Sequence, residues 1–162
     1  MVVAMRPARV VLVEPTGRDK PEYVKLREES RAWLEPWEPT IEGDDGVAED
    51  RFAEDAFDRF LSSASTPQSR RFLVRLASQR GRGDLIGQVS LNNIARGAFL
   101  CAALGYWVGH RFAGRGYMTE AVRLAVSLAF GPMRLHRVEA NIIPTNEPSR
   151  ALVRRLGVRL EG

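Results

Sequence analysis

The stretch that most constrains the fold of this chain runs from residue 104 to residue 130. Residues 104–108 form an apolar run of β type. From residue 116 onward, apolar side chains recur at steps of three and four residues, and Gly131 and Pro132 end this pattern. The sequence therefore predicts a strand, a glycine-bearing turn and an amphipathic helix in direct succession.

The predicted turn carries Gly114 and Gly116, with Arg111 and Arg115 beside them. Glycine adopts a positive φ readily and lets a ligand come close to the backbone. The first N–H groups of a helix have no intrahelical partner, and the helix dipole favours negative charge there. The turn is therefore a candidate phosphate site, with an ordinary tight turn as the alternative, because a Gly-x-Gly pattern alone is unspecific.

The pattern formed by Arg111, Gly114 and Gly116 resembles the pyrophosphate-loop signature of the GNAT superfamily of N-acetyltransferases. The wider sequence is similar to the RimJ/RimL-type branch, which acetylates the N-terminal amines of ribosomal proteins. This similarity is dense over residues 85–162, and it rests on residues 34–37, 105–108, 114–122 and 135–141, on Pro144, Asn146 and Ser149, and on residues 156–157 and 161–162.

For the fold, the resemblance implies the α/β (α+β) architecture of the GNAT family. We expect a central mixed, mostly antiparallel sheet with a splayed parallel strand pair and about four flanking helices, in one domain spanning residues 1–162. Residues 99–108 and 135–142 read as the two strands that the helix connects, in a right-handed parallel crossover. Relatives typically continue through two further strands, so we expect a C-terminally short domain that lacks the last strands.

The resemblance implies acetyl-coenzyme A as the cofactor, with its pantetheine arm between the splayed strands. Backbone groups around residues 107–109 are expected to bind this arm, and a backbone N–H near Val108 is expected to polarise the thioester carbonyl. The full set of expected cofactor contacts is Trp107, Val108, Gly109, Arg111, Gly114, Arg115, Gly116, Tyr117, Met118, Thr119, Asn141, Asn146 and Ser149.

Two residues are candidates for proton transfer. Asn146 is a predicted N-cap of the last helix, and the resemblance adds that a serine at the position of Ser149 can protonate the departing thiolate. The alternatives for Ser149 are cofactor contact only, a structural role, or release of the thiolate to water. Glu139, on one strand face with Arg137, is the candidate base, and an ion pair with that arginine is the alternative.

The predicted function is direct transfer of an acetyl group from acetyl-coenzyme A to a primary amine, with a protein N-terminal α-amine of the ribosomal-protein-alanine type as the favoured acceptor. An α-amine has a pKa of about 8 and a lysine side chain one of about 10.4, so the α-amine needs less help from a base. The alternatives are a small-molecule amine, such as an antibiotic or a polyamine, and a non-catalytic acyl-coenzyme A-binding module.

Charge is distributed unevenly along the chain. Residues 35–58 hold ten acids against one arginine, and residues 59–162 hold sixteen arginines against five acids. The acidic segment, including the loop at residues 42–46, suits the basic N-terminus of a ribosomal protein, and the basic remainder suits a polyanionic cofactor; solvated surfaces are the alternative for both. Basic residues are not interleaved with aromatic ones, so we expect no nucleic-acid partner.

Cysteine and histidine are scarce, because the chain holds Cys101 alone and only His110 and His136. We therefore expect no internal disulfide and no metal site. No apolar run approaches the length of a membrane span, and residues 1–13 lack a signal-peptide pattern, so we expect a cytoplasmic protein without membrane contact. An incomplete sheet edge would allow a homodimer.

The remaining elements follow from periodicity and from turn residues. We predict a strand at residues 9–13, helices at 19–34 and 47–61, a loop at 62–68, and a β-hairpin of residues 71–77 and 85–92. Trp33 and Trp37 are expected to pack the corner after the first helix. Gln88, Ser90 and Asn92 share one strand face and are expected to line a polar cleft or to face solvent.

Overall fold

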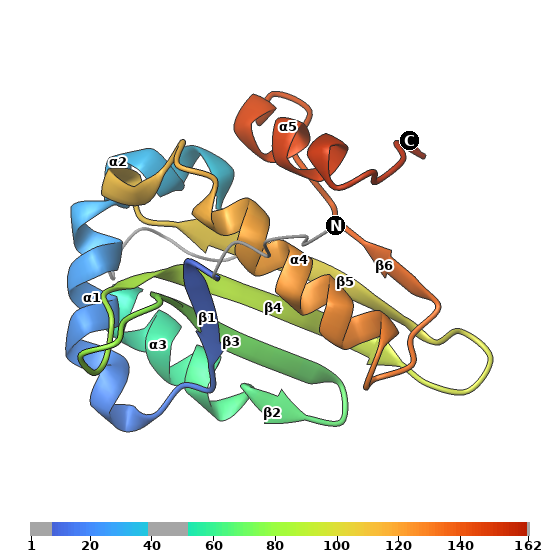
Figure 1. Cartoon of the computed structure of the whole chain (residues 1–162), viewed down its shortest axis with the longest axis horizontal. Coiled ribbons are helices and arrows are strands. Elements are labelled where there is room, and N and C mark those ends of the chain that lie inside the picture. The colour runs from blue at the N-terminus through green and yellow to red at the C-terminus, as the bar shows by residue number, and fades with distance from the viewer. Residues whose placement is uncertain (1–7, 39–51, 162) are drawn as a thin grey trace, which may run out of the picture.

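The computed structural model describes residues 8–38 and 52–161. Figure 1 shows a twisted sheet whose one face is crossed by a long helix, with two short helices above its upper edge. The strands are β1 Val10–Val13, β2 Ser65–Thr66, β3 Ser69–Leu76, β4 Leu85–Ala95, β5 Cys101–Val108 and β6 Arg137–Glu139. The helices are α1 Lys20–Glu29, α2 Arg31–Leu34, α3 Phe52–Ser62, α4 Tyr117–Phe130 and α5 Glu147–Arg155, with 3-10 turns η1 Gly17–Asp19, η2 Glu35–Trp37 and η3 His110–Phe112.

The described strands form one six-stranded sheet in the order β1-β3-β4-β5-β6, with β2 paired to β3. Every pairing is antiparallel except that of β5 with β6, which is parallel and is connected through α4. The predicted mixed, mostly antiparallel sheet and the strand-helix-strand crossover are therefore confirmed.

The parallel pair is joined over a short length only. β6 pairs with Cys101 to Ala103 at the start of β5, whereas β5 continues to Val108 beside β4. The predicted second strand, residues 135–142, was too long, because the chain leaves the sheet after Glu139 and turns toward α5. This divergence is the splay expected from the resemblance, and it opens the sheet on one side of β5.

Helices cover both faces of the sheet. On β4, the position of Gly87 lies against the Met118 side chain of α4, whereas the next residue, Gln88, accepts a hydrogen bond from Tyr23 of α1. Successive strand residues point to opposite faces, so α4 covers one face and α1 covers the other. The core is formed by α4 residues such as Ala121 and Val122 on the first face, and by aromatic residues of α1 and α3 on the second, Tyr23, Phe57 and Phe60.

The predicted helix at residues 19–34 is divided at Ser30 into α1 and α2. Ser30 is buried, and its hydroxyl accepts a hydrogen bond from the backbone N–H of His110 at 3.0 Å. The break thus coincides with a residue whose backbone departs from helical geometry, with φ of −108° and ψ of 6°. The predicted loop at 62–68 contains β2, which pairs with the beginning of β3.

Gln88, Ser90 and Asn92 lie beneath the α1 and α3 layer, where Asn92 donates to the Ser90 hydroxyl at 2.9 Å. They belong to an internal polar network and not to a solvent-facing strand surface. The acidic loop at residues 42–46 and the first part of the predicted second helix lie outside the described residues. Among the described residues, no helix is long and apolar enough to cross a membrane, and no group of three or more metal-ligating side chains occurs.

Candidate functional site

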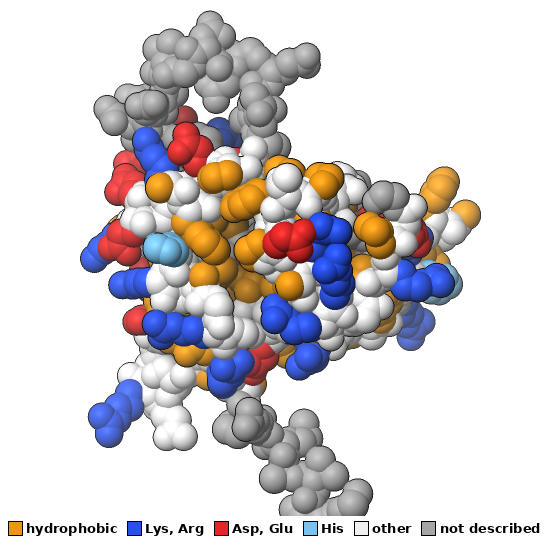
Figure 2. Space-filling model, turned by 90° about the horizontal axis from the view of Figure 1, so that it is seen from above, with side chains coloured by type: hydrophobic (Ala, Val, Ile, Leu, Met, Phe, Trp, Pro, Cys, Tyr) orange, Lys and Arg blue, Asp and Glu red, His pale blue; other side chains and the backbone are white. Residues whose placement is uncertain are grey.

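A cleft of about 840 Å³ runs between the N-terminal ends of α4 and α5 and along the open side of β5. Figure 2 shows hydrophobic side chains gathered around a hollow on the face seen from above, with basic side chains on its rim. Residues from seven segments line the cleft: Arg9, Trp33, Leu34, Trp37, residues 106–108, residues 112–120, Arg123, Asn146, Pro148, Ser149, Ala151, Leu152 and Arg155.

The loop before α4 has the conformation that the glycine pattern predicts. Gly114 and Gly116 have φ values of 72° and 78°, and Gly116 is the N-cap of α4. The first intrahelical hydrogen bond runs from the N–H of Glu120 to the carbonyl of Gly116, at 3.2 Å. The N–H groups of Tyr117, Met118 and Thr119 therefore point out of the helix end, where they favour an anion. A Cβ built on Gly114 meets nothing within 4 Å, so its surroundings are open.

The end of β5 forms the floor of the cleft, with Tyr106, Trp107 and Val108 in its lining. Beyond Ala103, the backbone groups of β5 that point away from β4 have no strand partner among the described residues. The Trp107 side chain is fixed, because its indole N–H donates to Gln88 at 3.2 Å and the Arg27 guanidinium lies 5.2 Å from its ring centroid. This floor offers backbone donors and acceptors to an extended ligand.

Two residues with a hydroxyl group, Tyr106 of β5 and Ser149 of α5, lie close together at the N-terminal end of α5. The Asn146 side chain accepts a hydrogen bond from the Ser149 N–H at 3.1 Å, which confirms Asn146 as the N-cap. The Tyr106 hydroxyl donates to the Ser149 carbonyl at 3.3 Å. Burial raises the pKa of Tyr106, so its hydroxyl keeps its proton at neutral pH.

The cleft wall facing α5 is apolar and aromatic. Trp33, Leu34 and Trp37, from α2 and η2, line it. The Trp33 ring stacks on the ring of His110 with centroids 5.3 Å apart, which places this wall beside the end of β5. Glu120 is the only acidic residue among the described residues of the lining, and it is paired with Arg9. An uncharged amine with an apolar neighbour suits such a wall better than a polycation does.

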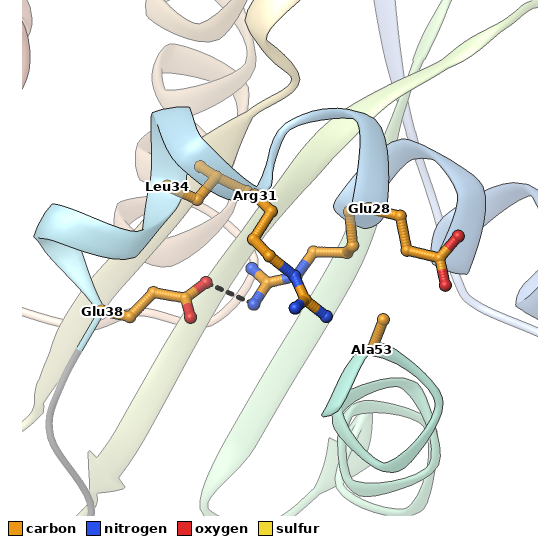
Figure 3. A pocket seen from close by; sticks show the side chains of 6 residues that line it. Glu28, Arg31, Leu34, Glu38 and Ala53 are labelled. Atoms are coloured by element: carbon orange, nitrogen blue, oxygen red, sulfur yellow. Dashed lines mark hydrogen bonds and ion pairs between the residues drawn. The ribbon is translucent and has the colours of Figure 1, made fainter. Parts of the chain in front are cut away.

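A small pocket on the outer side of this wall is lined by Arg27, Glu28, Arg31, Leu34, Glu38 and Ala53. In Figure 3, a dashed line joins the Glu38 carboxylate to the Arg27 guanidinium. This ion pair links the residue after η2 to α1. Because the pocket has room for little more than a water molecule, about 20 Å³, its residues support the aromatic wall and do not form a second cleft.

Ten of the thirteen expected cofactor contacts line the cleft, and Gly109, Arg111 and Asn141 do not. Gly109 is buried, its N–H donates to the Ile86 carbonyl at 2.8 Å, and a Cβ there would lie 2.5 Å from Leu26. It thus permits the close approach of α1. The Arg111 side chain is exposed and lies over the Phe112 ring, 4.7 Å from its centroid, and Asn141 is exposed.

Glu139 lies on β6 outside the cleft lining, and its carboxylate accepts a hydrogen bond from Arg137 Nε at 3.2 Å. The ion pair that the sequence offered as the alternative to a base is therefore present. Sequence patterns did not indicate Arg9 or Tyr106 as cleft residues. Strand pairing brings these two residues to the cleft. The tryptophan-rich corner at residues 33–37 did indicate the aromatic wall, but on the sequence alone we interpreted it only as packing.

Comparison with known proteins finds one matching family profile and several similar proteins. The profile of the family described as "Acetyltransferase (GNAT) domain" matches residues 9–159. A Bacillus subtilis protein, "Probable N-acetyltransferase YjcK", is 46% identical over 78 residues, which is 48% of this chain and 43% of that protein. The match therefore spans less than half the length of that relative.

Two other similarities extend over nearly the full chain. The "[Ribosomal protein uS5]-alanine N-acetyltransferase" of Escherichia coli is 28% identical over 171 residues, covering 99% of this chain and 80% of that protein. The solved structure of "Mycobacterium smegmatis RimJ in complex with CoA-disulfide" superimposes with a TM-score of 0.82 at 32% identity, over 96% of this chain and 73% of that one. The similarity thus includes the sheet, helix α5 and the loop that precedes α4.

Proposed function

Because the chain belongs to the GNAT family of acetyltransferases, we propose that it transfers the acetyl group of acetyl-coenzyme A to a primary amine. The observation that carries this proposal is the continuity of the cleft, which joins an anion-binding helix end to the open side of β5. The residues fit the cofactor, since Gly114 and Gly116 leave room for phosphate and residues 106–108 offer unpaired backbone groups for an extended arm.

Each expected cofactor contact in the lining has a defined role in this proposal. The backbone N–H groups of residues 117–119 and the side chain of Arg115 bind the pyrophosphate. Val108, whose backbone groups point away from β4, binds the pantetheine through them, with its N–H directed at the thioester carbonyl, whereas the backbone groups of Trp107 face Gln88 of β4. Asn146 holds the first turn of α5, and thereby the position of Ser149.

When bound, acetyl-coenzyme A supplies an activated acetyl thioester that an amine attacks directly. The chain holds the two reactants in one cleft, so proximity and orientation provide a large part of the rate. Ser149, at the start of α5, would donate a proton to the departing sulfur and would regain one from water, which takes up the proton that the amine loses. Tyr106 holds the backbone of Ser149 through its hydrogen bond. Arg137 holds Glu139 outside the cleft, so we assign Glu139 a structural role.

For the acceptor, we propose the N-terminal α-amine of a protein. Two observations support it: the full-length relative from Escherichia coli that is named for a ribosomal-protein alanine, and the apolar wall of Trp33, Leu34 and Trp37. An α-amine with a pKa of about 8 is partly neutral at physiological pH and fits a wall without unpaired carboxylates.

The proposal is tested by calorimetric binding of acetyl-coenzyme A to the wild type, to Gly114→Glu and to the control Gly97→Glu. Both glycines have a positive φ and open surroundings, so the two substitutions impose similar backbone strain. Gly97 lies in the turn between β4 and β5, outside the cleft lining. We expect binding to weaken at least a hundredfold, about 2.7 kcal/mol, in Gly114→Glu alone, because a carboxylate in the loop repels phosphate.

A folded wild type that does not bind acetyl-coenzyme A would refute the proposal. With binding established, an acceptor panel compares alanine-initiated peptides that carry a free or an acetylated N-terminus with spermidine. Turnover of the free peptide alone supports the α-amine. Turnover of spermidine alone would identify a small-molecule enzyme, and binding without turnover of either acceptor would indicate a non-catalytic module.

A further inference from the structure

We propose that Arg9, from the segment just before β1, is a fixed hydrogen-bond donor to the pyrophosphate of the cofactor. This inference rests on the proposed function, since it adds a residue to the phosphate site at the start of α4. Arg9 lines the cleft, although 105 residues separate it from Gly114 in the sequence. The pairing of β1 with β3 brings it to the sheet edge where α4 begins.

The guanidinium of Arg9 is held on three sides. Its Nε donates to the Glu120 carboxylate at 3.0 Å, and its Nη1 donates to the Arg115 carbonyl at 3.1 Å. Its plane lies over the Tyr117 ring, with the central carbon 5.0 Å from the ring centroid. The side chain is 53% exposed, but these three contacts restrict it, so it loses less entropy on binding a ligand than an unrestrained arginine would.

One edge of the guanidinium remains for a ligand. Nη2 lies 3.3 Å from the position of a Cβ on Gly116, the N-cap of α4, and nothing in the described part of the chain accepts its hydrogen bonds. This nitrogen therefore stands at the loop where the N–H groups of residues 117–119 emerge. A guanidinium edge and a helix N-terminus that line the same cleft suit an oxygen-rich dianion such as pyrophosphate.

The negative charge of Glu120 beside the phosphate site is a second reason to assign Arg9 a role there. Glu120 lies in the first turn of α4, lines the cleft and would repel a phosphate. Arg9 neutralises this carboxylate through Nε, and the backbone N–H of Arg9 also donates to it, at 2.8 Å. The backbone contact is retained when the side chain is changed, so a substitution at Arg9 tests the guanidinium and leaves the attachment of β1 to α4 in place.

The test measures binding of coenzyme A and of 3′-dephospho-coenzyme A by calorimetry to the wild type, Arg9→Gln, Glu120→Gln and the double variant Arg9→Gln/Glu120→Gln. Arg96→Gln is the matched control, because Arg96 is an exposed arginine that donates to the Met133 carbonyl at 2.7 Å and lies outside the cleft lining. Thermal unfolding of each variant verifies that it is folded.

We expect Arg9→Gln to weaken both ligands by a similar factor, roughly tenfold, as is typical for a lost hydrogen bond to a charged group. We expect Arg96→Gln to bind as the wild type does, and the double variant to bind more weakly than Glu120→Gln.

Three outcomes would overturn the inference while leaving the proposed function intact. The first is unchanged binding in Arg9→Gln. The second is equal affinity of the double variant and Glu120→Gln, which would show that Arg9 only neutralises the carboxylate. The third is a loss that disappears with 3′-dephospho-coenzyme A, which would move the contact to the 3′-phosphate. A folded wild type that binds neither ligand would instead refute the proposed function together with the inference.

Discussion

The two walls of the cleft are built in different ways. The wall at the start of α4 comes largely from one continuous segment, residues 112–120, and it includes the backbone N–H groups at the helix end. The wall opposite consists of the side chains of Trp33, Leu34 and Trp37, from helices far away in the sequence. The first wall presents N–H groups and positive charge, and the second presents aromatic surface. Under the proposed function, the first wall would bind the anionic cofactor and the second would contact the acceptor.

This difference suggests which wall recognises the cofactor and which wall recognises the acceptor. Backbone N–H groups at a helix end recognise phosphate whatever the neighbouring side chains are, so many sequences with the same loop share one cofactor. The aromatic wall consists of side chains, and its position depends on how α1 and α2 are attached to the sheet. We therefore expect substitutions to separate cofactor binding from acceptor use.

The largest effect is expected on stability, at the buried ion cluster that attaches α1 to the sheet. Asp19 is fully buried, and its carboxylate accepts hydrogen bonds from Thr16 and from Arg75 Nη2 at 2.8 Å, and one from Arg82. Removing one member of a buried charged cluster costs about 3 kcal/mol. We expect Asp19→Asn to lower the free energy of unfolding by about this amount, as measured with urea, while the folded variant binds acetyl-coenzyme A normally.

The same buried ion cluster predicts that the stability of the fold depends on pH. Burial alone would raise the pKa of Asp19, but its hydrogen bonds from Thr16 and Arg75 and the charge of Arg82 outweigh burial and lower it. The pKa of Glu22 is likewise lowered against the effect of burial, by Arg75 and by the Leu85 N–H. The stabilisation is therefore fully present above the unfolded-state pKa, about 4, and is lost as the pH falls through the lower folded-state values.

Urea unfolding at several pH values below 5 checks this prediction, since the stability difference between the wild type and Asp19→Asn should shrink as the pH falls. Glu161→Gln is the control. Its hydrogen bond with Arg137 lowers the pKa of Glu161, but the pair is exposed, so little loss of stability is expected. A constant difference between the wild type and Asp19→Asn at all pH values would contradict the assigned charge state.

The second-largest effect is expected on kcat, at the hydroxyl groups of Ser149 and Tyr106 near the start of α5. If Ser149 protonates the leaving sulfur, Ser149→Ala lowers kcat about a hundredfold with little change in the affinity for acetyl-coenzyme A. Tyr106→Phe removes only the hydrogen bond to the Ser149 carbonyl and should lower kcat less. Steady-state kinetics measures both variants, with Glu139→Gln as a control expected to remain within about twofold of the wild type. A larger loss in Tyr106→Phe than in Ser149→Ala would transfer the proton-donor role to Tyr106.

The smallest effect is expected at the aromatic wall. Trp37→Ala removes a large surface from the acceptor side of the cleft, and we expect the KM for an alanine-initiated peptide to rise about tenfold. The Kd for acetyl-coenzyme A should not change, because the loop before α4 is untouched. Peptide kinetics and calorimetry on the same preparation measure both quantities. A comparable loss for both ligands would show that the two walls do not divide their roles in this way.

Much of the first wall was predictable because its geometry is local. The positive φ values of Gly114 and Gly116 and the amphipathic helix after them follow from residue type and spacing over a few positions, as does the N-cap Asn146 of α5. The second wall was not predictable in the same way. The pattern at residues 19–34 favours one helix, whereas the structure has a break at Ser30, whose hydroxyl accepts a hydrogen bond from His110, eighty residues away.

By itself, the sequence determined the order of strands and helices, the phosphate-type turn and the separation of acidic and basic segments, since each depends on the preferences of neighbouring residues. The tertiary structure alone decided where β5 and β6 separate, after Ala103, and that Gly109 lies against α1. It also brought Arg9 to Glu120. Such contacts join residues that only strand pairing and helix packing make neighbours, and no local preference encodes them.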